Sequence, residues 1–409
     1  MGAPQVRPHR PGWWPRWVFA GALVLLLSFW WRSASRDLVI PVPPATTRTG
    51  AGVAQALSLF AFDPVATRAA EPSAVSAPVL PADPLQEEAC GSDLAGLSID
   101  TPLREAALGP IDALMLASDD VQLRAAALLI GARERRGDDR TRIDRLARLA
   151  AGSQDAIVYA IALEGCKGWS ADDAGACGLL SRAQWTRLDS DNALPWLGLA
   201  AEAQQRHDFD AEAEAMQRAA SARRIDAHAG VLPALVDRAL GNQAPPLQRM
   251  LALSAGWSAQ AGWVPSHANQ AQVYCGADAV ADRERRPSCE ALAETLASRS
   301  TSVSDLGVAL AIGRNLGWAA ERLEALQQEQ DAFSEAGGFQ AIGFDPGCDG
   351  VARMQAWTRQ LAARGELQAT RDALARSGRS VEQWSAQYRR NFAVATAAAA
   401  EAATSVAPP

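Results

Sequence analysis

The chain has 409 residues, of which 48% are hydrophobic and 21% are charged, and its formal net charge is −7. These proportions are ordinary for a globular protein. The acidic balance argues against a nucleic-acid-binding protein, which would carry a basic patch or stripe. Alanine is abundant and there are three tyrosines and nine phenylalanines, a composition that favours helices over strands.

An apolar stretch flanked by tryptophans predicts a membrane anchor over residues 13–31. Its length is close to the roughly 20 apolar residues that cross a bilayer, and its tryptophans can lie at headgroup level. Arg7, Arg10 and Arg16 precede its uninterrupted apolar part, residues 17–31, whereas two arginines and an aspartate follow it. This bias places a tail, residues 1–12, in the cytoplasm. We therefore expect a single-pass protein of a bacterial inner membrane whose C-terminal domain lies in the periplasm.

A cleaved signal peptide is the alternative interpretation of this segment. Such a peptide has a basic start, a shorter apolar core and a cleavage site of small residues. Here the apolar core ends in bulky aromatic residues, Phe29 to Trp31, directly before Arg32 and the small residues Ser33 to Ser35. The aromatic residues argue against cleavage and favour a retained anchor.

Residues 32–94 are rich in proline, alanine, threonine and serine, which predicts an extended and poorly ordered spacer. Such a spacer would hold the following domain away from the membrane surface. A short apolar run, Ala54 to Phe62, interrupts it. This run is expected to form a small helix that docks on the domain.

All six cysteines lie after the predicted anchor. An even number in an exported domain indicates disulfides. Pairing of sequence neighbours favours the bonds Cys166–Cys177 and Cys275–Cys289, which leaves Cys90 and Cys348 for a third. No two cysteines form a C-x-x-C motif, so neither a redox motif nor a zinc ribbon is indicated. Buried free thiols are the alternative.

Residues 95–405 are expected to form one all-α domain, because helical periodicity recurs and no segment shows convincing strand alternation. Ser153 is the expected N-cap of the third helix, a capping box starting at Ser170 introduces the fourth, and Pro287 separates two later helices. The helices are predicted over residues 121–135, 141–151, 154–165, 172–188, 247–260, 278–286, 288–298, 303–316, 319–333, 349–364, 367–376 and 380–403.

The most patterned part of the chain runs from residue 192 to residue 225. Large and small residues recur there over two helical segments joined by a His-Asp-Phe turn. The residues that carry the pattern are Trp196, Leu199, Ala200, Phe209, Met216 and Ala219. The pattern resembles one tetratricopeptide repeat, a helix–turn–helix unit of about 34 residues, in which these side chains pack the two helices together.

The resemblance has departures. Ala203 replaces a tyrosine, Glu212 stands where the family places a small alanine, and Arg224 stands where it places proline. Leu163–Asp189 and Asp226–Leu240 are interpreted as degenerate neighbouring units. The resemblance implies helical hairpins stacked in a tetratricopeptide-like array, whose groove would hold an unknown protein or peptide. An ordinary helical hairpin with a chance match is the alternative.

No catalytic, cofactor or metal motif stands out from the sequence. The three histidines after the anchor, His207, His228 and His267, form no metal-binding spacing, and a turn or surface role is expected for them. Segment 334–339 is faintly similar to the Glu-Ser-Gly motif of lytic transglycosylases, with Glu335 as its acid, but no Gly-Leu-Met-Gln follows.

These observations predict a membrane-anchored periplasmic protein-interaction or scaffold protein without a catalytic site, cofactor or metal and without affinity for nucleic acid. A cell-envelope enzyme that acts on peptidoglycan is one alternative. A purely structural envelope component is the other.

Overall fold

The computed structural model describes residues 101–134, 140–168, 175–241, 244–261, 263, 268–336 and 348–405. The predicted anchor, the spacer, the run from Ala54 to Phe62, Cys90 and His267 lie outside the described residues. The chain divides into two compact units, residues 52–385 and residues 1–51 with 386–409. Of the second unit, the structure describes residues 386–405, which belong to one helix.

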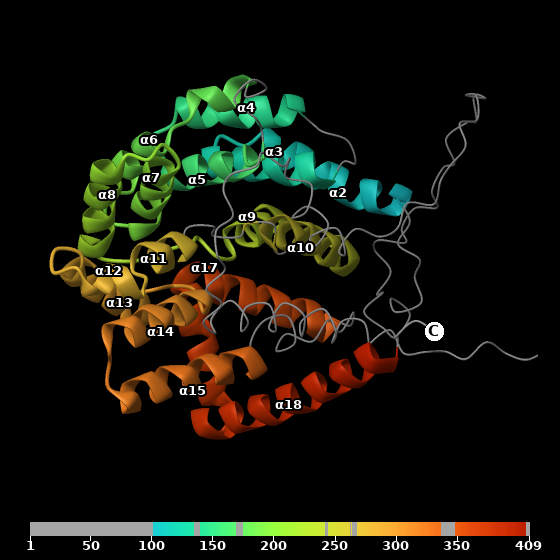
Figure 1. Cartoon of the computed structure of the whole chain (residues 1–409). Coiled ribbons are helices and arrows are strands. Elements are labelled where there is room, and N and C mark those ends of the chain that lie inside the picture. The colour runs from blue at the N-terminus through green and yellow to red at the C-terminus, as the bar shows by residue number, and fades with distance from the viewer. Residues whose placement is uncertain are drawn as a thin grey trace, which may run out of the picture. The chain divides into compact units, whose positions relative to one another are not determined.

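The described residues form helices and contain no β-strand, which confirms the all-α class (Figure 1). Over the same residues, no helix is both long enough and apolar enough to cross a bilayer. The elements are α2 (Thr101–Leu116), α3 (Val121–Glu134), α4 (Arg140–Ala151), α5 (Ala156–Gly165), the 3-10 helix η4 (Gly175–Leu179), α6 (Arg182–Leu188), α7 (Ala193–Gln205), α8 (Phe209–Ser221), α9 (Val231–Leu240), α10 (Pro246–Ala261), α11 (Ala268–Tyr274), α12 (Ala277–Ala281), α13 (Arg286–Ser298), α14 (Ser304–Leu316), α15 (Ala320–Ala336), α17 (Cys348–Arg376) and α18 (Val381–Ser405).

The start of α5 differs from the prediction. Asp155, rather than Ser153, is its N-cap, because the Asp155 carboxylate accepts hydrogen bonds from the backbone N–H groups of Ile157 and Val158. Ser153 acts one step earlier and accepts a hydrogen bond from the Asp155 N–H at 3.0 Å. The two side chains therefore form consecutive turns, and the helix begins two residues later than expected.

The single helix predicted over residues 172–188 is wrong over its described part. The chain forms η4, leaves the helical path, and starts α6 with Ser181 as a new N-cap that accepts a hydrogen bond from the Gln184 N–H. The disulfide at Cys177 fixes η4 beside the end of α5. Residues 170–174, including the predicted capping box, lie outside the described residues.

Two later boundaries compare differently with the prediction. The separation predicted at Pro287 is wrong, because α12 ends at Ala281 and α13 already begins at Arg286. Pro287 occupies the first turn of α13, where the missing N–H has no helical partner to lose. The two helices predicted at 349–364 and 367–376 form α17, which is interrupted at Gly365 with φ 75° and ψ 163°. The kink is therefore a true break in helical geometry, as the sequence predicted.

Two large core clusters hold residues 101–385 together. The first buries apolar side chains of α2–α6 against α9, α10 and α17, and it includes a run of alanines, Ala125 to Ala127, that lets helices approach closely. The second packs α7 and α8 against α11–α14 around Met216 and Leu292. A smaller cluster joins α14, α15 and the end of α17 around Phe333 and Leu367.

Helices far apart in sequence complete this packing. Helix α8 packs on α13, whereas the hairpin that follows α8, made of α9 and α10, packs on α2, α3 and α17. Successive hairpins therefore do not stack on one another in chain order, as they do in a regular repeat array. The chain returns at α17 to cover the hairpin formed by α9 and α10 (Figure 1).

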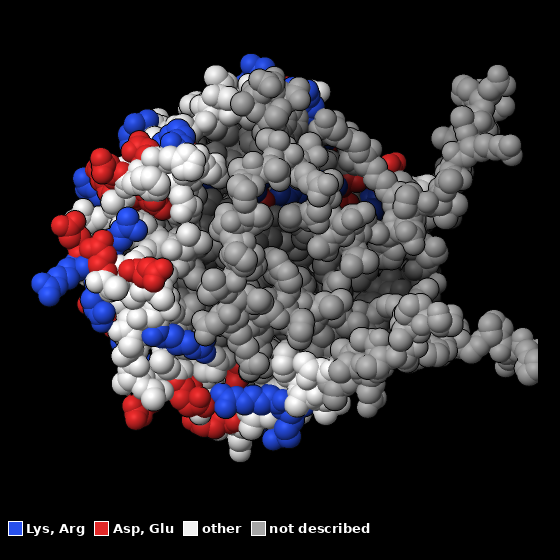
Figure 2. All heavy atoms as spheres, viewed as in Figure 1, with Lys and Arg blue, Asp and Glu red and all other residues white. Residues whose placement is uncertain are grey.

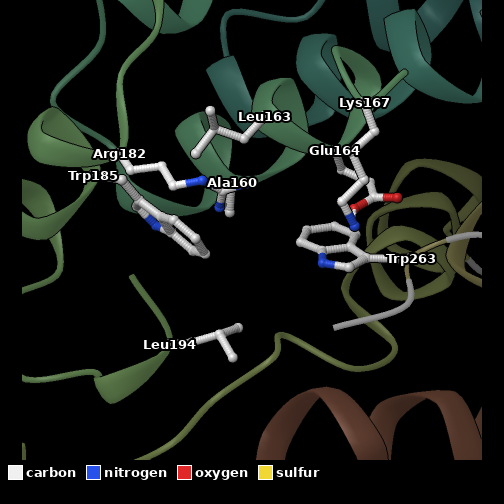
Figure 3. A pocket seen from close by; sticks show the side chains of 8 residues that line it. All are labelled: Ala160, Leu163, Glu164, Lys167, Arg182, Trp185, Leu194 and Trp263. Carbon is white, nitrogen blue, oxygen red and sulfur yellow. Dashed lines mark ion pairs between the residues drawn. The ribbon is translucent and has the colours of Figure 1, made fainter. Parts of the chain in front are cut away.

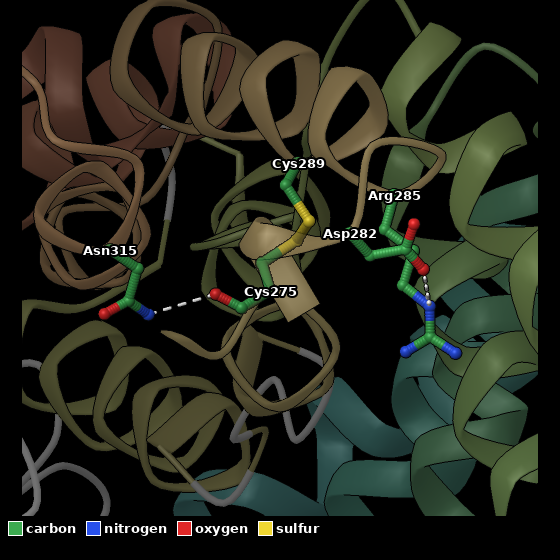
Figure 4. The surroundings of a disulfide bond; sticks show 5 residues. All are labelled: Cys275, Asp282, Arg285, Cys289 and Asn315. Carbon is green, nitrogen blue, oxygen red and sulfur yellow. Dashed lines mark hydrogen bonds and ion pairs between the residues drawn. A yellow bond between two sulfur atoms is a disulfide. The ribbon is translucent and has the colours of Figure 1, made fainter. Parts of the chain in front are cut away.

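Two disulfides close short loops, and they are the two local pairs expected from the sequence. Cys166–Cys177 joins the end of α5 to η4, and Cys275–Cys289 joins the end of α11 to α13. Figure 4 shows the second bond with its neighbours, where the Asn315 amide donates to the Cys275 carbonyl oxygen at 3.0 Å. The third expected pair includes Cys90, which lies outside the described residues.

The two bridges are expected to differ in their susceptibility to reduction. Cys275 and Cys289 are both fully buried, whereas Cys166 and Cys177 are partly exposed. Because an attacking thiolate must reach a sulfur atom, a low concentration of a dithiol should open Cys166–Cys177 first. Stepwise alkylation followed by mass spectrometry measures the order. The double variants Cys166→Ala/Cys177→Ala and Cys275→Ala/Cys289→Ala identify each product, and simultaneous reduction of both bonds would contradict the expectation.

Candidate functional site

The most connected buried polar group is the side-chain amide of Asn192, which is fully buried before α7. Its Oδ1 caps α7 by accepting from the Leu194 N–H at 3.2 Å and also accepts from the Asp226 N–H at 3.0 Å. Its Nδ2 donates to Asp189 Oδ2 and to the Asp226 carbonyl oxygen, both at 2.9 Å. All four hydrogen-bonding positions of the amide are therefore used.

Backbone hydrogen bonds extend this contact across three loops. The Ala193 N–H donates to the Arg224 carbonyl oxygen at 2.9 Å, and the Thr301 N–H donates to the Ile225 carbonyl oxygen at 2.9 Å. Two isolated parallel bridges, Asn192 with Arg224 and Ile225 with Ser300, describe the same pairing. The loops before α7, after α8 and after α13 are thereby held side by side.

Charged side chains surround the amide. Arg224 pairs with Asp189 at 2.5 Å and with Asp226 at 2.9 Å. His228, which has a left-handed backbone with φ 53°, lies between the same carboxylates, with its Nδ1 3.5 Å from Asp226 and its Nε2 3.7 Å from Asp189. Its Nε2 is buried and forms no hydrogen bond with the described part of the chain. We call Asp189, Asn192, Arg224, Asp226, His228 and Thr301 the polar junction.

The electrostatics of the polar junction favour the ionised form of Asp189. Burial alone would raise the pKa of this carboxyl. The close side chains of His228 and Asn192 and the charge of Arg224 outweigh burial, so the pKa of Asp189 lies below its ordinary value. Asp189 is therefore an ionised carboxylate held by Arg224, Asn192 and His228. The Thr301 hydroxyl, which donates to Asp226 Oδ1 at 3.1 Å, joins the third loop to this charge network.

Most of the residues expected to pack the repeat-like hairpin lie between its helices. Ala200, Met216 and Ala219 are buried, and Trp196 and Leu199 are partly buried at the edge of the second core cluster. The indole N–H of Trp196 donates to the Ser190 carbonyl oxygen at 2.9 Å. Phe209 differs from these residues, because it starts α8 with 59% of its surface exposed and its ring centroid lies 6.3 Å from that of His207.

The two charged residues that depart from the repeat pattern, Glu212 and Arg224, both contact other polar side chains. Glu212 is buried and its carboxylate accepts from the Gln270 amide at 2.8 Å, which ties α8 to α11. Burial raises the pKa of Glu212, although the Arg285 charge and the Gln270 hydrogen bond oppose it. Arg224 replaces the expected proline and supplies the central cation of the polar junction.

A small cavity lies between two tryptophans at the side of α5. Figure 3 shows Trp185 and Trp263 on opposite sides of it, with the side chains of Glu164, Lys167 and Arg182 near its rim. Glu164 pairs with both Arg133 and Lys167, and Arg182 pairs with Glu202 at 2.9 Å. The cavity measures about 20 Å³, which is room for about one water molecule. This volume does not admit an organic ligand.

A larger and more open cleft lies between α8 and α13, with a volume of about 360 Å³. Its lining residues are Ala220, Ala291, Glu294, Thr295, Ser298 and Arg299. Glu294 pairs with Arg322 of α15 at 2.6 Å, and this contact lowers its pKa. Figure 2 shows acidic and basic side chains intermingled over the described residues of one face. The lining of the cleft itself is mainly polar, with alanine at two positions.

The residues that could support catalysis or metal binding do not come together. Glu335 lies in the last turn of α15, and residues 337–339 of the similar motif lie outside the described residues. His207 and His228 both lie in turns, as expected, but His228 is buried rather than at the surface. Within the described ranges, no cluster of three histidine, cysteine or acidic residues could hold a metal ion.

Compared with protein-family models, curated proteins and solved structures, the chain has no significant match.

Sequence reasoning missed the polar junction as a unit. In the sequence, Asn192 marked only the start of the repeat-like segment, Asp226 the start of a degenerate neighbouring unit, and His228 a turn or surface position. One signal was available, because Asn192 and Asp226 are separated by 34 positions, about the length of the repeat that the segment resembles. Equivalent ends of a helical hairpin meet at that spacing.

Replacing Asn192 with alanine is expected to destabilise the domain by about 3 kcal/mol. The variant would leave the Asp226 N–H and carbonyl and the Asp189 carboxylate without buried partners. Urea unfolding measures the loss. Asn269→Ala, at an exposed position of α11, is the matched control and should change stability little. An equal effect of the two substitutions would contradict the central role of Asn192.

Proposed function

We propose that this protein is a membrane-anchored scaffold that holds another protein or peptide outside the cytoplasm. The cleft between α8 and α13 is the observation that carries the proposal. It adjoins the repeat-like hairpin, and the resemblance to tetratricopeptide repeats implies a groove of this kind. The anchor is proposed for residues 13–31.

The chemistry of the cleft supports a peptide segment as its occupant. Ala220 and Ala291 have short side chains, so an extended backbone can approach the helices closely. Thr295 and Ser298 carry hydroxyls, and Arg299 carries an exposed positive charge. Polar walls and a rim of both charges are typical of surfaces that bind transient partners rather than of a permanent interface.

The two disulfides are compatible with an oxidising compartment outside the cytoplasm. The arginine bias of the predicted anchor independently favours the same side. Together they support the periplasm of a bacterium with an inner membrane as the place where the scaffold works. A cell-envelope enzyme and a purely structural component remain the competing functions, and no residue arrangement described above favours either.

A photoreactive amino acid at Ser298, introduced into the full chain in native membranes, is expected to capture a reproducible partner. The same photoreactive amino acid in place of Ser334 is the matched control. Both serines are exposed near the ends of helices, and both donate their hydroxyl to a carbonyl oxygen four residues earlier. Capture should be strong at position 298, which lines the cleft, and weak at position 334. Mass spectrometry of the cross-linked products identifies the partner.

Charge reversal at Arg299 provides the second arm of this experiment. Arg299→Glu should lower the yield of the cross-link at position 298 by about fivefold, equivalent to about 1 kcal/mol of binding. Equal labelling at positions 298 and 334 would contradict the scaffold proposal. Turnover of peptidoglycan by the purified protein, lost in Glu335→Gln, would replace it with the enzyme alternative.

The proposed compartment predicts the number of reactive thiols. In protein taken directly from native membranes and denatured without reductant, Cys166, Cys177, Cys275 and Cys289 should resist alkylation because they are paired. At most two of the six cysteines should therefore react. Mass spectrometry after alkylation gives the count, with a reduced sample as control. Six reactive thiols would contradict the extracytoplasmic location.

A further inference from the structure

The kink in α17 is docked on the loop between α13 and α14. A side chain at Gly365 would place its Cβ 2.6 Å from the Thr301 Cβ, so this contact requires glycine. The Leu367 N–H donates to the Thr301 carbonyl oxygen at 3.0 Å. Glu366 accepts with one carboxylate oxygen from the Val303 N–H at 3.1 Å and from the Ser302 hydroxyl at 3.3 Å.

A second carboxylate, which is fully buried, lies on the other side of the same loop. Asp305, in the first turn of α14, has 3% of its surface exposed and accepts a hydrogen bond from the Ser300 hydroxyl. Asp305 and Glu366 therefore flank one short serine-rich loop. Neither forms an ion pair with a basic residue in the described part of the chain. The pair differs in this respect from Asp189 and Asp226, which share Arg224.

The other charged groups on the surrounding elements are engaged elsewhere. Arg299 of the loop is exposed, and His228 lies beside Asp189 and Asp226. The remaining contacts are Arg364 with Asp372, Arg371 with Glu329, Arg322 with Glu294, Arg224 with Asp189 and Asp226, and Asp331 with Gln327 and Ser385. No described cation thus compensates the two carboxylates.

This environment disfavours ionisation. Burial raises the pKa of Asp305 to about 6, the Ser300 hydrogen bond opposes the rise, and the charge of Glu366 adds to it. Burial also raises the pKa of Glu366, against its hydrogen bonds from Val303 and Ser302. A carboxyl whose folded-state pKa exceeds its unfolded value stabilises the folded state below the unfolded pKa, and this stability is lost as the pH rises through the folded pKa.

We propose that Asp305 and Glu366 form a proton-operated latch, the carboxyl latch, which holds the kink of α17 on the loop between α13 and α14. With a proton on the pair, like-charge repulsion is absent and the contact is closed. With both groups ionised, the contact loosens, and the segment after the kink opens more readily. That segment carries Leu367 and Leu374, which pack in the small core cluster with Phe333, so the latch controls how firmly α17 binds α15.

Hydrogen exchange of the full chain at pH 5 and pH 7.5, corrected for intrinsic exchange rates, tests the carboxyl latch. For Asp305, a change from about 6 in the closed state to an ordinary value in the open state makes opening about tenfold more frequent at the higher pH. The gain should be confined to residues 366–376 and the start of α14. Amides in α7 serve as the internal reference.

Asp305→Asn keeps the acceptor for Ser300 and removes the charge, so residues 366–376 should remain protected at both pH values. Glu366→Gln keeps an acceptor for the Val303 N–H and provides the same test if the first variant folds poorly. His228→Asn controls for the neighbouring imidazole, because asparagine also suits the left-handed backbone at this position. The pH response of residues 366–376 should persist in this variant. An unchanged pH response in both carboxyl variants, or an equal response in α7, would overturn the proposal.

Discussion

The side-chain amide of Asn192 is the contact on which the arrangement of the helices depends. Helices leave unpaired backbone groups at their ends, and loops that meet in a protein interior must pair their own. Asn192 satisfies the start of α7 and both backbone groups of Asp226 with one side chain. Because those groups belong to opposite ends of a hairpin, a single residue fixes the hairpin's exit relative to its entry. With the exit of the hairpin fixed in this way, Ile225 lies where it can pair with Ser300 in the loop after α13.

Carboxyl groups on the two sides of the loop between α13 and α14 have different partners. At the polar junction, Asp189 and Asp226 share Arg224 and the Asp189 carboxylate also accepts from Asn192, so ionisation of Asp189 is favoured. Beyond Thr301, Asp305 and Glu366 have neutral donors, so ionisation is disfavoured. The partners of the two sites differ, because Asp189 has the cation Arg224 beside it whereas Asp305 has the neutral hydroxyl of Ser300. The contacts of ionised Asp189 therefore hold the loops together, whereas the contact of Asp305 and Glu366 is the one that we propose to loosen as the pH rises.

The sequence predicted local structure better than assembly. Apolar periodicity located α3, α14 and the two halves of α17, because each helix carries its own pattern. Cysteine spacing indicated both short disulfides. The break between η4 and α6 was missed because periodicity does not register a covalent constraint at Cys177. The polar junction was missed because its members come from different loops, and their proximity depends on packing that no single segment encodes.

The return of α17 onto α9 and α10 has a consequence for how the chain reaches its native state. The apolar faces of α9 and α10 are completed by α17, which begins at Cys348, whereas α10 ends at Ala261. Such long-range closure raises contact order and slows folding relative to a bundle built from neighbours. Until α17 packs on them, those apolar faces are exposed to water and open to wrong associations.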